Sequence, residues 1–255
     1  MRELPLRHVA LLGYRVIDEP PERIAKVVCD RIQARAEHCF SCLNPHSIVV
    51  ARDDPTLQSF FRTQSELLCD GVGLSIANRI LNRRSINRVW GQDFFLAVSR
   101  EMSARRSGRV LFLGGHPDWI QDLVAKYRQD FPGLTEISTH VPPFKSEFSP
   151  ADIEEMARAV SAFNPDILWI GVGSPKQEKL LCELQKRCHV PCGAAIGAVF
   201  DFYCGRVKLG PKWIRDAGLL WAYRLIKEPR RLWRRTFLSA PRFAGQVFLQ
   251  LVRRE

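Results

Sequence analysis

Asp70 is the residue of this chain best placed to act as a general base. It follows the short apolar run Leu67–Cys69 and precedes Gly71 and Gly73, so its carboxylate is expected at a strand end beside a cleft. A carboxylate in that position can accept the proton of an attacking hydroxyl group. The same pattern is as typical of an Asx turn or a helix N-cap, so spacing alone leaves both interpretations open.

Four loops are expected at the carboxyl ends of strands, at residues 44–47, 69–73, 112–117 and 171–178. Glycines in these loops let backbone N–H groups approach an anion such as a pyrophosphate. The glycines that we assign to binding are Gly71, Gly114, Gly115 and Gly173. Together the loops indicate a nucleotide site, although each is a weak signal by itself.

Two amide side chains belong to the same loops. Asn44 and Gln177 have the chemistry to orient a sugar or a base, and their alternative role is local capping of the backbone. Lys176 stands where the dinucleotide fingerprint that starts at Gly171 requires its third glycine, which disfavours classical NAD binding.

The sequence predicts no metal site and no cofactor other than a donor substrate. It contains no Asp-x-Asp of the kind that holds a divalent ion on a nucleotide sugar. The pairs Cys39–Cys42 and Cys188–Cys192 have spacings that would allow one zinc site. We favour buried thiols on separate strands, because alternate residues of a strand face apart.

The positive charge of the chain is concentrated at its end. Residues 205–255 hold 13 Lys and Arg against 3 acids, a net charge of +10 out of +11 for the whole chain. Arg224, Lys227, Arg231 and Arg234 are spaced by 3, 4 and 3 residues, as on one helical stripe. Tryptophans at 213, 221 and 233 lie among them.

Such a basic, aromatic segment suits phosphates at a membrane interface and equally those of nucleic acid. A third interpretation is a solvated basic face with its tryptophans packed into the body.

The elements that must position these residues alternate along the chain. Strands are expected at 9–12, 39–43, 67–69, 110–113, 135–139, 167–171 and 192–196, with helices at 21–36, 46–65, 74–81, 117–128, 151–163 and 176–187. This alternation predicts an α/β fold, with a mostly parallel Rossmann-like sheet and helices on both faces. We place an α/β body at 1–204 and a basic helical appendage at 205–255, broken at Pro229 and Pro241.

Composition agrees with a globular protein, since 46% of the residues are hydrophobic and 25% charged. No apolar run approaches the roughly 18–20 residues that cross a bilayer. The N-terminus lacks the pattern of a signal peptide, and eight cysteines fit a reducing compartment. We therefore expect a cytoplasmic protein.

These motifs, in this order, resemble the WecG/TagA/CpsF family of bacterial glycosyltransferases over roughly residues 8–245. The most specific pieces are the segments GSPKQE at 173–178 and EPRRLWRR at 228–235. Further matches are LNPHS at 43–47, DGVG at 70–73, RVWGQD at 88–93, LGG at 113–115, PPF at 142–144 and GAVFDF at 197–202.

The resemblance implies inverting transfer of a hexose-type sugar from a UDP-sugar to a polyprenyl-diphosphate-linked saccharide in the synthesis of a bacterial surface polysaccharide. It implies that Asp70 is the base and that Gln177, Arg224, Arg231 and Arg234 bind donor or diphosphate. It also implies metal-independent chemistry, a peripheral position on the inner face of the cell membrane and a possible homo-oligomer. Cys42 stands where the family has a threonine, so a hydroxyl contact there is not expected.

Two other classes of function stay open at this stage. An NAD-type oxidoreductase would share the fold but needs the GxGxxG turn that this chain lacks. A nucleic-acid-binding protein would use the basic appendage and would show salt-sensitive retention on DNA. We favour the transferase and expect no nucleic-acid partner.

Overall fold

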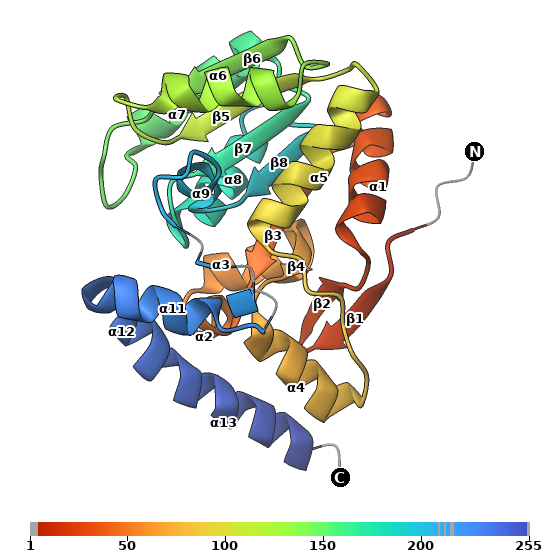
Figure 1. Ribbon diagram of the computed structural model, residues 1–255, viewed down its shortest axis with the longest axis vertical. Coiled ribbons are helices and arrows are strands. Elements are labelled where there is room, and N and C mark those ends of the chain that lie inside the picture. Colours follow the sequence, from red (N-terminus) through yellow and green to blue (C-terminus); the bar gives the residue numbers. More distant parts are fainter. Residues whose placement is uncertain (1–4, 209, 212, 215–216, 254–255) are drawn as a thin grey trace.

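Eight strands form one sheet in the order β1-β2-β4-β3-β8-β7-β5-β6 (Figure 1). This computed structural model describes residues 5–208, 210–211, 213–214 and 217–253. The strands are β1 (His8–Leu11), β2 (Tyr14–Ile17), β3 (His38–Leu43), β4 (Glu66–Cys69), β5 (Arg109–Gly114), β6 (Glu136–His140), β7 (Ile167–Gly171) and β8 (Cys192–Ala195). β1 and β2 pair antiparallel, and every other neighbouring pair in this order is parallel. The predicted mostly parallel α/β sheet is confirmed.

Helices cover both faces of the sheet, as predicted (Figure 1). One face packs against α1 (Pro21–Gln33), α5 (Gly91–Ala104), α6 (Ile120–Asp130) and α9 (Val199–Tyr203). The other packs against α2 (Pro45–Arg52), α3 (Pro55–Ser59), α4 (Val72–Asn82), α7 (Pro150–Phe163) and α8 (Lys176–Gln185), with a π-helical turn, η1 (Phe60–Gln64), after α3. We call the apolar layers on these faces the first core and the second core.

Alternation along the central strands fills the two cores. In β3, Phe40 belongs to the first core, whereas Cys39 and Leu43 belong to the second. The first core is strongly aromatic, and the rings of Phe95 and Trp169 pack edge to face with centroids 5.0 Å apart. Central parallel strands buried on both faces are the reason that the sequence shows continuous apolar runs there.

Three elements have no counterpart among the strands and helices predicted from the sequence: β2, α5 and the short helix α9. β2 forms a hairpin with β1 through Leu12 and Gly13, whose φ values of 51° and 80° fit a two-residue turn between right-twisted strands. α5 packs beside α1 and fills the first core with Phe94 and Phe95. The pattern of apolar residues in the α5 segment is amphipathic and would have supported a helix.

The appendage consists of α11 (Leu220–Lys227), α12 (Pro229–Phe237) and α13 (Ser239–Val252). Pro229 begins α12, as expected from a break at that residue. The second break lies at Leu238, between α12 and α13, three residues before the predicted position; Pro241 itself lies in the first turn of α13, where no backbone N–H is needed. Figure 1 shows α13 running beneath α2 and α4, and it packs against both. In the part of the chain that the structure describes, no helix is long and apolar enough to cross a membrane.

Candidate functional site

Asn44 and Asp70 follow directly opposite residues of two neighbouring strands. Leu43 of β3 pairs with Cys69 of β4, so the next residue on each strand emerges at the same edge of the sheet. The backbone N–H of Asp70 donates to the carbonyl oxygen of Leu43 at 2.9 Å, which continues the ladder by one bond. The parallel register thus places the predicted base beside the Asn44 loop.

Asn44 caps α2. Its Oδ1 accepts the backbone N–H groups of His46 and Ser47, each at 3.1 Å, while the Ser47 hydroxyl lies 2.8 Å from the Asn44 backbone N–H and accepts from it. This reciprocal capping box confirms the capping role that was the alternative interpretation of Asn44. A contact to substrate stays a prediction.

The N-termini of α2 and α4 meet beside Asp70. Gly71 is the N-cap of α4 with φ +92°, a conformation that favours glycine. Gly73 packs so closely on Pro45 that a Cβ at Gly73 would lie 2.5 Å from the proline Cγ. Helix N-termini carry partial positive charge and unpaired N–H groups, so this corner of the sheet favours an anion.

The other predicted glycines line the same edge farther along. Gly114 pairs with Gly171, and a Cβ on Gly114 would lie 2.6 Å from the Gly171 carbonyl oxygen. Gly115 is closed in by Ile120, whereas a Cβ on Gly173 would meet nothing within 4 Å. Gly173, like Gly71, therefore has open space in front of it, as backbone that approaches a ligand requires.

Gln177 lies 3% exposed at the start of α8. Its Oε1 accepts the backbone N–H of Gly197 at 2.9 Å, and its Nε2 donates to Glu178 Oε1 at 3.0 Å. The Ser41 hydroxyl of β3 donates to the same Glu178 oxygen at 3.2 Å. Through its bond to Gly197, Gln177 connects α8 to the turn after β8. A direct contact between Gln177 and the substrate stays a prediction.

Charges at this edge act on two thiols. Burial, with a smaller contribution from the charge of Asp70, raises the pKa of Cys69 to about 12, against the opposing effects of a hydrogen bond with Ser75 and the positive charge of Arg88. Burial, followed by the charges of Asp70 and Glu178, raises the pKa of Cys42 well above its usual range. Cys42 and Cys69 are therefore unreactive thiols near Asp70. Because Glu178 acts on Cys42 and Arg88 acts on Cys69, these two charged residues lie in the same region.

Sequence reasoning assigned no role to Arg88 or Glu178. Both lie in motifs that carried the family resemblance, RVWGQD and GSPKQE, and that membership was the available signal. Their positions depend on which loops meet, and the order of the strands decides that.

The appendage lies against the Asp70 loop. A Cβ on Gly218 would lie 2.9 Å from both Arg88 Nη1 and Val72 Cγ2. Arg224 places its guanidinium over the Phe202 ring, 5.1 Å from the centroid, and its Nη2 lies 3.6 Å from Glu228 Oε1. Arg231 and Arg234 belong to α12, and their side chains lie outside the described part of the structure.

The cysteine pairs match the expected strand positions in part: Cys39 and Cys42 lie on β3 and Cys192 on β8, whereas Cys188 lies between α8 and β8 and is half-buried. All eight cysteines are free, and Cys39 and Cys192 belong to opposite cores. Among the described residues, no group of three or more His, Cys, Asp or Glu side chains is arranged to hold a metal ion.

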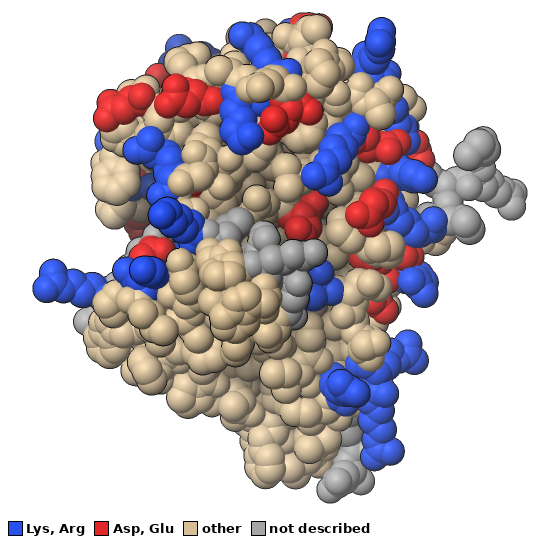
Figure 2. Space-filling view, viewed as in Figure 1, with Lys and Arg blue, Asp and Glu red and all other residues tan. Residues whose placement is uncertain are grey.

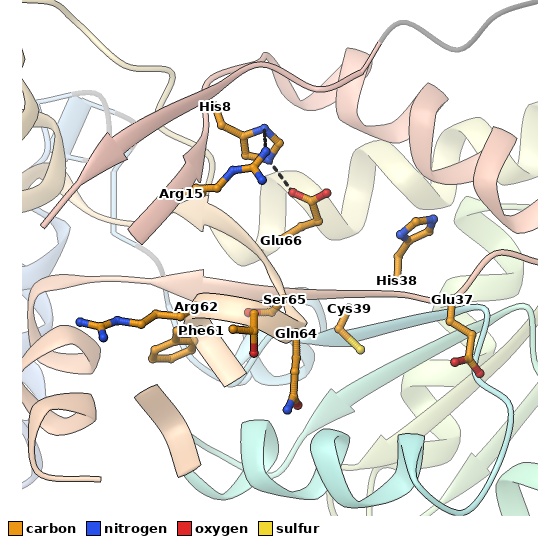
Figure 3. A pocket seen from close by; sticks show the side chains of 11 residues that line it. His8, Arg15, Glu37, His38, Cys39, Phe61, Arg62, Gln64, Ser65 and Glu66 are labelled. Carbon is orange, nitrogen blue, oxygen red and sulfur yellow. Dashed lines mark hydrogen bonds and ion pairs between the residues drawn. The ribbon is translucent and has the colours of Figure 1, made fainter. Parts of the chain in front are cut away.

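A hollow of about 290 Å³ opens at the opposite, amino-terminal edge of the sheet (Figure 3). His38 and Glu66, at the starts of β3 and β4, line it together with His8, whose Nε2 lies 2.5 Å from Glu66 Oε2. None of the predicted site residues lines this hollow. Among the described residues, glycine turns and helix N-termini meet in the loops after the strands, so we place the candidate site there rather than in this hollow.

Comparison with known proteins identifies relatives over most of the chain. The model of the family described as "Glycosyl transferase WecG/TagA/CpsF family" matches residues 9–255. A protein of Bacillus subtilis (strain 168), named N-acetylglucosaminyldiphosphoundecaprenol N-acetyl-beta-D-mannosaminyltransferase, is 28% identical over 208 residues, which is 82% of this chain and 78% of the relative. A protein of the same name from Bacillus spizizenii (strain ATCC 23059 / NRRL B-14472 / W23) is 27% identical over 80% of this chain and 76% of its own length. The chain belongs to the WecG/TagA/CpsF family of glycosyl transferases.

Proposed function

We propose that this protein transfers a hexose-type sugar from a UDP-sugar to a saccharide linked to polyprenyl diphosphate, with inversion at the anomeric carbon. The names of the two Bacillus relatives support a lipid-diphosphate acceptor. The product would enter a bacterial surface polysaccharide, and the enzyme would work on the inner face of the cell membrane.

The contact of Gly218 with Val72 and Arg88 carries this proposal. It sets the basic, aromatic appendage directly on the loop that holds Asp70. One edge of the sheet thus combines a carboxylate, two helix N-termini and a segment suited to a phospholipid surface. A transferase that moves a sugar from a soluble nucleotide sugar to a lipid-linked acceptor uses these three features together.

The chemistry follows as a single displacement. The acceptor hydroxyl oxygen attacks the anomeric carbon, its proton passes to Asp70, and the bond from that carbon to the diphosphate oxygen breaks. UDP leaves with the bonding electron pair, so negative charge grows on its diphosphate. The N-termini of α2 and α4, together with Arg88 and Arg224, would stabilise that charge without a metal ion.

The lower surface of the molecule suits a lipid interface. Figure 2 shows that face mostly free of charge, with Lys and Arg side chains at its margins. Its exposed apolar side chains come from the appendage and from α4: Ile76, Ile80, Trp213, Leu219, Trp221, Ile226, Trp233, Phe237, Leu238, Phe248, Leu249, Leu251 and Val252. The exposed tryptophans contradict the interpretation in which they pack into the body. Aromatic side chains with basic residues beside them are typical of proteins that lie on an anionic membrane.

Product formation from a panel of UDP-sugars and a lipid-diphosphate saccharide, read by mass spectrometry, tests the activity. Asp70→Asn should lower the rate at least about 100-fold, because the carboxylate that takes the proton is lost. Asp166→Asn provides the matched control, since Asp166 lies before β7 at the other edge and pairs with Arg35. Full turnover by the Asp70→Asn variant would exclude Asp70 as the base.

Ligand-induced thermal stabilisation separates the three classes of function. UDP should raise the melting temperature and NAD should not. Stabilisation by NAD alone would favour the oxidoreductase, and salt-sensitive retention on DNA without sugar transfer would favour a nucleic-acid-binding protein.

Vesicle sedimentation tests the membrane contact. The double variant Trp213→Ser, Trp221→Ser should bind vesicles rich in phosphatidylglycerol much more weakly than the parent protein does. Phe144→Ser is the matched control, because Phe144 is fully exposed and belongs to the loop before α7 rather than to the appendage. Equal loss in both variants would argue against the appendage as the specific membrane surface.

A further inference from the structure

Glu178 is a buried carboxyl group for which the proposed displacement has no use. It is 1% exposed, in the first turn of α8. Within the described part of the chain, no Lys, Arg or His forms an ion pair with it. A buried carboxylate without a cation is costly, and proteins usually avoid the cost by keeping the group protonated.

The hydrogen bonds around Glu178 determine which atoms donate. The backbone N–H of Gly197 can only donate, so the Gln177 atom that faces it at 2.9 Å must be the oxygen. The Gln177 nitrogen therefore faces Glu178 Oε1, at 3.0 Å, and donates to it. The hydroxyl of Ser41 lies 3.2 Å from the same oxygen; it donates to Oε1 when Glu178 is ionised, and it can accept from Oε1 when that oxygen carries the proton.

The second carboxyl oxygen of Glu178 has different surroundings from the first. Oε2 is buried and has no hydrogen-bond partner among the described residues. Ionisation would spread negative charge onto this unsolvated atom, whereas a neutral carboxyl group leaves it without formal charge. Burial raises the pKa of Glu178, against smaller opposing contributions from Gln177, its own backbone N–H, Ser174 and Ser41.

The turn that Gln177 holds is the meeting point of several site elements. A Cβ on Gly171 of β7 would lie 3.1 Å from the carbonyl oxygen of Gly197. A Cβ on Gly91, at the start of α5, would lie 3.2 Å from both the Ile196 carbonyl oxygen and Cys42 Sγ. A small shift of the turn at 196–199 would therefore move β7, α5 and the end of β3 against one another.

We propose that Glu178 is a positioning residue that stays protonated during turnover and fixes the Gln177 carboxamide, which in turn fixes the turn at 196–199 that packs against the end of β3 at the candidate site. The inference rests on the proposed function, in which a nucleotide diphosphate binds at that site. A neutral Glu178 also keeps a second negative charge away from an incoming diphosphate. The groups that face it are Ser41 and Cys42 of β3, Ser174 before α8 and Gln177 on its own helix, with Asp70 beyond Cys42.

Steady-state kinetics of two variants distinguishes positioning from simple packing. Glu178→Gln keeps an oxygen that accepts from Gln177 and Ser41, and it should stay within about threefold of the parent protein in kcat/KM. Glu178→Leu keeps the volume but removes the acceptor, and kcat/KM should fall roughly 10- to 100-fold, mainly through a higher KM for the donor. Equal activity of the Leu variant and the parent would overturn the proposal, and so would a Gln variant as impaired as the Leu variant.

Infrared spectroscopy of the full-length protein tests protonation without any turnover. Isotope-labelled glutamate should show the carbonyl stretch of a protonated carboxyl group near neutral pH, and Glu178→Gln should remove it. Glu154→Gln, an exposed side chain of α7, should leave it unchanged. Absence of this band from the parent protein would overturn the proposal even if Glu178→Leu fails to fold. Because the band does not depend on sugar transfer, the assay also separates failure of this inference from failure of the proposed activity.

Discussion

The imidazole Nδ1 of His46 and the hydroxyl oxygen of Ser239 lie 2.8 Å apart, although 193 residues separate them in the chain. His46 is in the first turn of α2, two residues after Asn44, and Ser239 begins α13. The bond ties the end of the basic appendage to the helix whose N-terminus faces the candidate site. Docking of the appendage and the geometry of the Asn44 loop are therefore coupled.

Ser239→Ala should lower the free energy of unfolding by about 1 kcal/mol, because it removes one partner of a largely buried hydrogen bond. Chemical denaturation measures the change. Ser146→Ala, on an exposed loop, provides a control that should stay within about 0.5 kcal/mol of the parent protein. A double-mutant cycle with His46→Ala should give a coupling energy clearly above zero; additive effects would mean that the two side chains do not interact in solution.

Phe243→Ala should destabilise the whole protein by about 3 kcal/mol or more, since Phe243 is 7% exposed and belongs to the second core. Phe248, on the same helix, is 64% exposed, so Phe248→Ala should change stability by less than about 0.5 kcal/mol. Thermal unfolding of both variants gives the comparison. If Phe243→Ala leaves the melting temperature unchanged, α13 does not contribute to the core of the body.

Gly114→Ala should be among the most damaging single substitutions. Gly114 has φ +121°, and a Cβ there would lie 2.6 Å from a backbone oxygen of β7. The loss should exceed about 2 kcal/mol, because backbone strain and a steric clash add. Gly245→Ala is its counterpart inside α13, where a Cβ meets nothing within 4 Å, and it should stabilise by up to about 1 kcal/mol. Reversal of this order in a denaturation experiment would contradict the packing at the Gly114–Gly171 pair.

Glu178 should make stability depend on pH. Its pKa in the folded protein is raised, mainly by burial, so the folded state binds a proton more tightly than the unfolded state does. Its stabilising contribution is complete below the unfolded pKa of about 4.3 and is lost as the pH rises through the folded pKa, with a slope of up to about 1.4 kcal/mol per pH unit. Glu178→Gln lacks this slope, so the stability of the Gln variant relative to the parent protein should increase as the pH rises. Parallel stability curves for the two proteins would show that the carboxyl group titrates normally.

The sequence by itself determined the class of fold and the position of the candidate site at one edge of the sheet. Apolar runs buried on both faces, helices with 3.6-residue spacing, and glycine, asparagine or aspartate after most of the runs are local signals, and each was readable without the structure. The segment β7 was predicted with its observed bounds, Ile167–Gly171, for this reason. The excess of arginine and tryptophan after residue 205 was equally visible in the sequence.

Only the tertiary structure decided which of these residues meet. The pairing of Leu43 with Cys69 brings Asn44 beside Asp70, and the order of the strands brings Gln177 to Gly197. The burial of Phe243 shows that α13 is integrated with the body. Such contacts join residues far apart in the chain, and they depend on strand order, register and the approach of helices. No local pattern encodes these quantities, because each is fixed by how all the apolar faces are buried at once.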